Sequence, residues 1–81
     1  MRCEVLLFAQ LAEAIGSDRL TIELPEGATV AEALALLSKD HETIAATANA
    51  IAVAVNEQYS ATTAVLNDGD TIALIPPVSG G

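Results

Sequence analysis

The residues of this chain best suited to chemistry are its last two, Gly80 and Gly81. Neither has a reactive side chain, and what they offer is a free carboxylate at a slender end. Because glycine has no Cβ, two in succession pass through a channel too narrow for any other residue. We therefore expect Gly81 to be the reacting group and Gly80 to let it turn inside a partner's active site.

The residues just before this pair determine how it is presented. Pro76 and Pro77 hold the backbone extended, and Val78 and Ser79 continue it. Six extended residues reach roughly 20 Å at about 3.3 Å each. We expect a folded domain over residues 1–75 and an extended, flexible tail over residues 76–81 that enters another protein's active site. A frayed terminus without a role is the alternative, but it would not need two prolines.

Length and composition indicate one ordered domain. The chain has 81 residues, which leaves no room for a second domain. Hydrophobic residues make up 52% of it, enough to exclude intrinsic disorder despite the net charge of −8. The single cysteine, Cys3, excludes an internal disulfide and fits a reducing cytosol. In an apolar strand it is expected to be a buried small hydrophobic residue rather than a persulfide carrier.

The charge balance bears on the partners of the chain. Eleven acidic residues stand against three basic ones, so the chain repels nucleic acid and anionic membranes and favours basic protein surfaces. A dispersed charge that only maintains solubility is the alternative. We see neither a signal peptide nor the roughly 20 apolar residues that span a bilayer. The expectation is a cytoplasmic protein without nucleic-acid or membrane partners, and His41, the only histidine, suggests no metal site.

Apolar periodicity predicts several strands separated by turns. We expect strands at 3–8, 20–24, 51–55, 59–65 and 71–75, with turns at 25–27, 56–58 and 67–70. The first strand places Val5 and Leu7 on one face. The opposite face carries Leu6 and Phe8 and is therefore also partly apolar.

Three helical segments are expected between these strands. A short one over residues 10–15 ends at Gly16. Thr29 and Glu32 have the spacing of a capping box and begin the principal helix. A weaker helix, capped by Asp40, is expected to run to residue 50. The order predicts an α+β fold in which a mixed sheet of about four to five strands packs on one main helix, its last strand parallel to its first.

Four segments together resemble a known family over the whole chain, the small, sulfur-carrying subunits of molybdopterin synthase. They are Phe8-Ala9-Gln10, Val55-Asn56, Leu66-Asn67-Asp68-Gly69-Asp70 and Ile75-Pro76-Pro77-Val78-Ser79-Gly80-Gly81. The resemblance implies the ubiquitin-like β-grasp fold, in agreement with the element order.

The resemblance also implies a reaction sequence for Gly81. A ubiquitin-activating-like adenylyltransferase uses ATP to adenylate it, and the acyl-adenylate becomes a thiocarboxylate. The large synthase subunit then receives the tail, and the sulfur goes to a cyclic pyranopterin phosphate to form the dithiolene of molybdopterin. This chain would bind no cofactor and supply no acid or base, since those groups belong to the large subunit. The family's complex is a heterotetramer.

The residues expected to contact the large subunit follow from the same resemblance. An apolar patch of the sheet, matched here by Phe8, Tyr59 and Ile75, would dock on it. The tail residues Pro76, Pro77, Val78 and Ser79 would enter it. For Phe8 and Tyr59, a place in the core is the alternative, and the sequence leaves it open.

Three other functions remain open at this point. The chain could serve as a thiamine-type or other sulfur carrier, although those proteins usually lack a Pro-Pro-Val lead-in. It could be a protein modifier joined to lysines through Gly81. It could also be a ubiquitin-like interaction module whose tail has no role.

Overall fold

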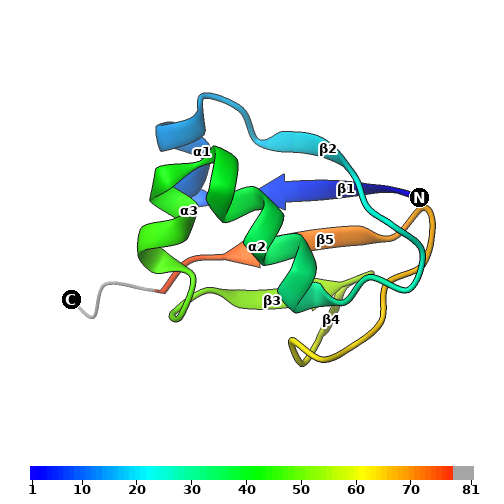
Figure 1. The fold of residues 1–81 in the computed structure, drawn as a ribbon. Helices are drawn as coiled ribbons and strands as arrows, with labels where there is room; N and C mark the ends of the chain where they lie inside the picture. The colour runs from blue at the N-terminus through cyan, green and yellow to red at the C-terminus, as the bar shows by residue number, and fades with distance from the viewer. Residues whose placement is uncertain (78–81) are drawn as a thin grey trace.

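The chain builds a mixed five-stranded sheet in the computed structural model, which describes residues 1–77 (Figure 1). The strands lie in the order β2-β1-β5-β3-β4. Their bounds are Arg2–Leu7 for β1, Arg19–Glu23 for β2, Ala52–Val55 for β3, Gln58–Tyr59 for β4 and Thr71–Ile75 for β5. β1 and β5 pair parallel and the other neighbours pair antiparallel, as expected for the last strand and for the first hairpin.

Helices cover one face of this sheet (Figure 1). The principal helix, α2 (Val30–Asp40), lies across the strands, and α3 (Glu42–Thr47) packs beside it. α1 (Ala9–Ile15) follows β1 directly and contacts α3. The α+β, ubiquitin-like architecture predicted from the sequence is therefore confirmed.

The core lies between the sheet and the helices and consists of small aliphatic side chains. Val5 and Leu74 from the two central strands are fully buried, and so are Val30 of α2 and Ile44 of α3. Within residues 1–77, no polar or charged side chain is buried, so the core has no polar group to satisfy. No helix in this part of the chain is long and apolar enough to cross a membrane.

The start of α2 is fixed by the expected capping box. The Thr29 side chain accepts a hydrogen bond from the Glu32 N–H at 3.3 Å, and a Glu32 carboxylate oxygen accepts one from the Thr29 N–H at 3.3 Å. Gly16 ends α1 in the left-handed conformation at φ 83°, as its position predicted.

The expected helix from Asp40 to residue 50 is wrong in both of its boundaries. Asp40 is the last residue of α2, and α3 begins after His41, whose side chain makes no capping hydrogen bond. The extended backbone of His41 (φ −133°, ψ 103°) separates the two helices. α3 ends at Thr47, and residues 48–50 form a turn instead of continuing the helix.

The expected strand over residues 59–65 is also mostly wrong, because β4 ends at Tyr59. The segment that follows accepts hydrogen bonds from the N-terminus of α2 instead. The carbonyls of Ala64 and Thr62 accept the N–H groups of Val30 and Ala31 at 3.0 and 2.9 Å. Two of the N–H groups that a helix start leaves unpaired are satisfied in this way. Val65 alone pairs like a strand residue, in an isolated bridge.

Candidate functional site

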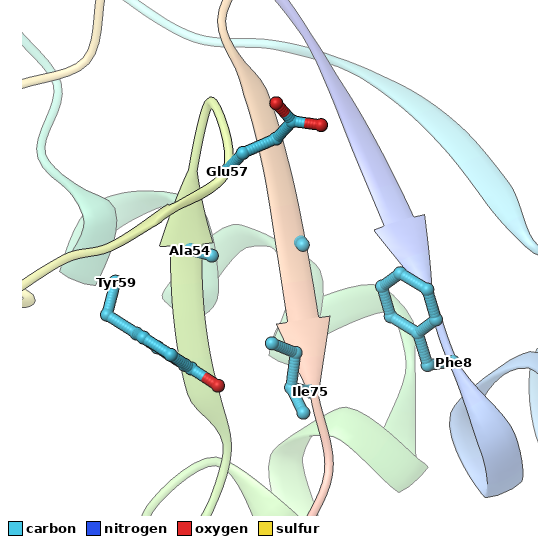
Figure 2. A pocket seen from close by; sticks show the side chains of 6 residues that line it. Phe8, Ala54, Glu57, Tyr59 and Ile75 are labelled. Atoms are coloured by element: carbon cyan, nitrogen blue, oxygen red, sulfur yellow. The ribbon is translucent and has the colours of Figure 1, made fainter.

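An apolar groove lies on the face of the sheet that the helices leave uncovered. Phe8, Ala54, Tyr59, Ala73 and Ile75 line it together with Glu57, and we refer to these six residues as the sheet groove (Figure 2). Strand alternation places the side chains of Ala54 and Ala73 on this face, opposite the core residues Val53 and Leu74. The two alanines are paired in the register and form a low floor between larger side chains.

The two aromatic side chains that form the walls of the groove are exposed to solvent. Phe8 is 46% exposed and Tyr59 78% exposed. This answers the question that the sequence left open, since neither side chain is a core residue of the folded chain. Exposed aromatic side chains grouped around an apolar floor are typical of protein interaction sites.

Phe8 is positioned by the turn from β1 into α1. Its backbone is extended (φ −124°, ψ 156°) and it is the N-cap residue of the helix, with its carbonyl accepting the Leu11 N–H at 3.1 Å. Ala9 then takes a positive φ of 48°. Leu11 is fully buried and anchors the helix in the core, so the chain is fixed on one side of Phe8 by a strand and on the other by a helix.

Tyr59 is positioned by the hairpin between β3 and β4. Its two-residue loop, Asn56-Glu57, has positive φ at both residues (51° and 71°), which is the requirement of a type I′ turn. Asn56 ties the loop to β5: its Nδ2 donates to Asp70 Oδ1 at 2.9 Å and its Oδ1 accepts the Thr71 N–H at 3.0 Å. Tyr59 then pairs with Ala54 at the edge of the sheet.

The predicted turn at 67–70 supports this arrangement. Asp70 Oδ2 accepts the Asn67 N–H at 2.8 Å, and Asp68 Oδ1 accepts the Arg2 N–H at 2.8 Å. Gly69 has φ 86°, where a side chain would be strained. The acidic side chains of this turn therefore hold β1, β5 and the β3–β4 hairpin together.

The C-terminal segment leaves the sheet beside the groove. Ile75 ends β5, paired with Ala52, and is partly exposed on the groove side. Pro76 is buried and Pro77 is exposed. The other expected tail residues, Val78, Ser79, Gly80 and Gly81, lie outside the described residues.

Cys3 is a core residue, as expected. Its side chain is fully buried, and its Sγ lies 3.6 Å from the Asn67 carbonyl oxygen. Burial, followed by the negative charge of Asp70, raises the pKa of the thiol. A thiol with a raised pKa is a poor nucleophile near neutral pH. Within residues 1–77, no group of three or more histidine, cysteine or acidic side chains could hold a metal ion.

The fold and the exposed groove define a small ubiquitin-like protein of the β-grasp class. The ThiS family profile matches residues 5–81, nearly the whole chain. The molybdopterin synthase sulfur carrier subunit of Arabidopsis thaliana is 35% identical over 78 residues, which are 96% of this chain and 81% of that protein. The chain therefore belongs to the ThiS family and is a relative of these carrier subunits.

Two solved structures are also similar to this chain over nearly its whole length. Small archaeal modifier protein 1 from Haloferax volcanii has a TM-score of 0.82 and 32% identity, with 95% of this chain and 98% of that chain covered. A complex of subunits 1 and 2 of the molybdopterin-converting factor from Helicobacter pylori contains a chain with a TM-score of 0.72 and 29% identity, with both chains fully covered.

Proposed function

We propose that this chain is the sulfur carrier subunit of a molybdopterin synthase, with the sulfur carried as a thiocarboxylate on Gly81. The observation that carries the proposal is the similarity to sulfur carrier subunits over 96% of the chain, combined with the Pro-Pro-Val-Ser-Gly-Gly ending. The complex from Helicobacter pylori supports a second, larger subunit as the partner. We also propose a cytoplasmic location and the heterotetrameric assembly of the family.

The chemistry of Gly81 follows from the poor electrophilicity of a carboxylate. An activating enzyme uses ATP to convert the carboxylate into an acyl-adenylate, and pyrophosphate is released. A donor of sulfur at the hydrosulfide level then attacks the carbonyl and displaces AMP, which leaves a thiocarboxylate after loss of the thiol proton. Its sulfur is anionic and nucleophilic, as thiolates are. It attacks a carbon of the cyclic pyranopterin phosphate held by the large subunit and forms a thioester. Water then hydrolyses the acyl C–S bond, which leaves the sulfur on the pterin and returns Gly81 as a carboxylate, and two such transfers complete the dithiolene.

The rest of the chain serves to present this terminus. Phe8, Tyr59 and Ile75 of the sheet groove dock on the large subunit, and Pro76, Pro77, Val78 and Ser79 lead the glycines into its active site. The position of Ile75 supports this arrangement, because it belongs both to the groove and to the last strand. Docking at the groove thus fixes the starting point of the tail. This chain binds no cofactor and leaves acid-base catalysis to its partner.

Deletion of Gly81 tests the proposal. The truncated chain should fold and bind the large subunit like the full chain, because the groove is unchanged. It should transfer no sulfur to the cyclic pyranopterin phosphate, because the thiocarboxylate carbon is gone. Normal sulfur transfer by the truncated chain would contradict the proposal.

A second candidate function is supported by the likeness to small archaeal modifier protein 1. A modifier would use the same activated Gly81 but transfer it to lysines of other proteins. It predicts conjugates of many sizes in cell extracts, dependent on Gly81. A thiamine-type carrier, the other member of this chemical class, would restore growth of a cell that lacks its own thiamine sulfur carrier.

A further inference from the structure

Glu57 occupies a backbone conformation that does not suit it. It is the second residue of the type I′ turn, at φ 71°. Glycine is strongly preferred at this position because it has no Cβ, and the usual pair is Asn-Gly. Here Asn56 is the usual first residue and glutamate replaces the glycine. A non-glycine residue in the left-handed region is uncommon and is often found where a side chain has a function.

No contact within the described part of the chain compensates for this conformation. Asn56 makes two side-chain hydrogen bonds to the start of β5, so its role is structural. Glu57 is exposed and makes no side-chain hydrogen bond among residues 1–77. The ion pairs in this range join Arg2 to Glu23 and Arg19 to Glu4, and neither involves Glu57.

The side chain is directed to the sheet groove. Glu57 lines the groove at the end opposite Ile75, with its carboxylate extended toward β5 (Figure 2). It is the only charged residue among the six that line it. A partner that fills the groove with apolar side chains would therefore meet one negative charge, at a fixed end of the site.

We infer that Glu57 determines the orientation and specificity of docking, by receiving a lysine or arginine of the large subunit whose apolar side chains fill the sheet groove. The inference rests on the proposed function, because that function supplies the partner. A basic group suits the site, since the chain has a net charge of −8 and Glu57 lacks a cation within residues 1–77. Because the single charge is at one end of an apolar site, it favours one orientation of the docked partner along the groove, as charges at the rim do at other interfaces.

The test measures the affinity of full-length variants for the molybdopterin synthase large subunit of the same organism. Glu57→Gln removes the charge and keeps the size of the side chain. We expect it to bind about fivefold more weakly at low salt. A loss of this size lies in the upper part of the range of binding free energy that an exposed ion pair contributes. Its affinity should also depend less on salt. Glu57→Lys should bind more weakly still.

Glu26→Gln is the matched control. Glu26 is exposed in the turn before α2, does not line the groove, and its substitution changes the net charge by the same single unit. It should bind within about twofold of the unmodified chain, since remote exposed charges contribute little. Equal affinities of the Glu57→Gln and Glu26→Gln variants would overturn the inference and leave the proposed function intact. Failure of the unmodified chain to bind would contradict both.

A second variant separates backbone conformation from partner recognition. Glu57→Gly should raise the melting temperature by about 4 °C, because glycine suits the positive φ, while it weakens binding as much as Glu57→Gln does. A more stable but weaker-binding protein is the expected result. A melting temperature below that of the unmodified chain would overturn the premise that Glu57 is kept at a cost in stability.

Discussion

Tyr59 should be important for docking and nearly dispensable for folding. Its side chain is 78% exposed in the free chain, so little of it stabilises the fold. A tyrosine buries about 150–250 Å² when fully covered, and at about 25 cal/mol per Å² the exposed part corresponds to about 3–5 kcal/mol. Because docking also orders the ring and covers it incompletely, we expect Tyr59→Ala to cost about 2 kcal/mol of binding free energy, roughly 30-fold in affinity.

The assay pairs calorimetric titration against the large subunit with chemical unfolding of the free chain. Tyr59→Ala should change the free energy of unfolding by less than about 1 kcal/mol, as for other exposed strand residues. Val65→Ala is the matched control, because Val65 is 60% exposed but does not line the groove. Equal affinities of the two variants would refute the assignment of the groove as the docking surface. A loss of stability as large as the loss of affinity would show that Tyr59 is a folding residue instead.

Three further predictions concern the cap of α2, the buried thiol and the surface charge. Thr29→Ala removes the capping box and should lower the free energy of unfolding by about 1 kcal/mol, seen in thermal denaturation as a fall of about 4–8 °C; an unchanged melting temperature would contradict it. Because burial raises the pKa of Cys3, the unfolded chain loses the thiol proton first, so stability should fall as pH rises above about 8.5. Comparison of Cys3→Ala with the unmodified chain isolates the contribution of the thiol to the pH dependence of the free energy of unfolding. If that free energy depended on pH in the same way for both proteins, the prediction would be contradicted. Association with the large subunit should slow as salt rises, since the chain carries a net charge of −8, and a salt-independent rate constant in stopped-flow mixing would rule out a basic partner surface.

The elements with strong periodicity could be predicted from the sequence. The strand expected at residues 20–24 is β2, and its side chains alternate as a half-buried strand requires: Ile22 is buried while Thr21 and Glu23 are exposed. The capping box at Thr29 and Glu32 fixed the start of α2 because both partners are local in the sequence. Local patterns of this kind predict structure well, since the interactions that matter lie within a few residues.

The errors arose where the controlling interactions are distant or the residues uninformative. The segment after Tyr59 holds the N-terminus of α2 through carbonyls of Thr62 and Ala64, a contact between segments far apart in the sequence. Such long-range hydrogen bonds leave no periodic signal. The sequence placed the break between the two helices at Asp40, one residue before His41, because aspartate is a common N-cap residue whereas the His41 side chain makes no capping hydrogen bond.

The candidate site was predicted in part. Alternation placed Phe8 on the face away from the core, and the structure leaves it half exposed there. For Tyr59 the sequence could not distinguish core from surface, because an aromatic residue in a short strand suits both. Glu57 was assigned only to a turn, since its positive φ and its place in the groove depend on how Asn56 is tied to β5.

The most direct test of the sulfur-carrier proposal is the intact mass of the chain, purified from cells that also make its activating enzyme and a sulfur donor. We predict a shift equal to the replacement of one oxygen by sulfur, mapped to the C-terminal peptide that ends in Gly81. An unshifted mass, with the activating enzyme shown to be active, would contradict a thiocarboxylate carrier and would favour the modifier or the inert interaction module.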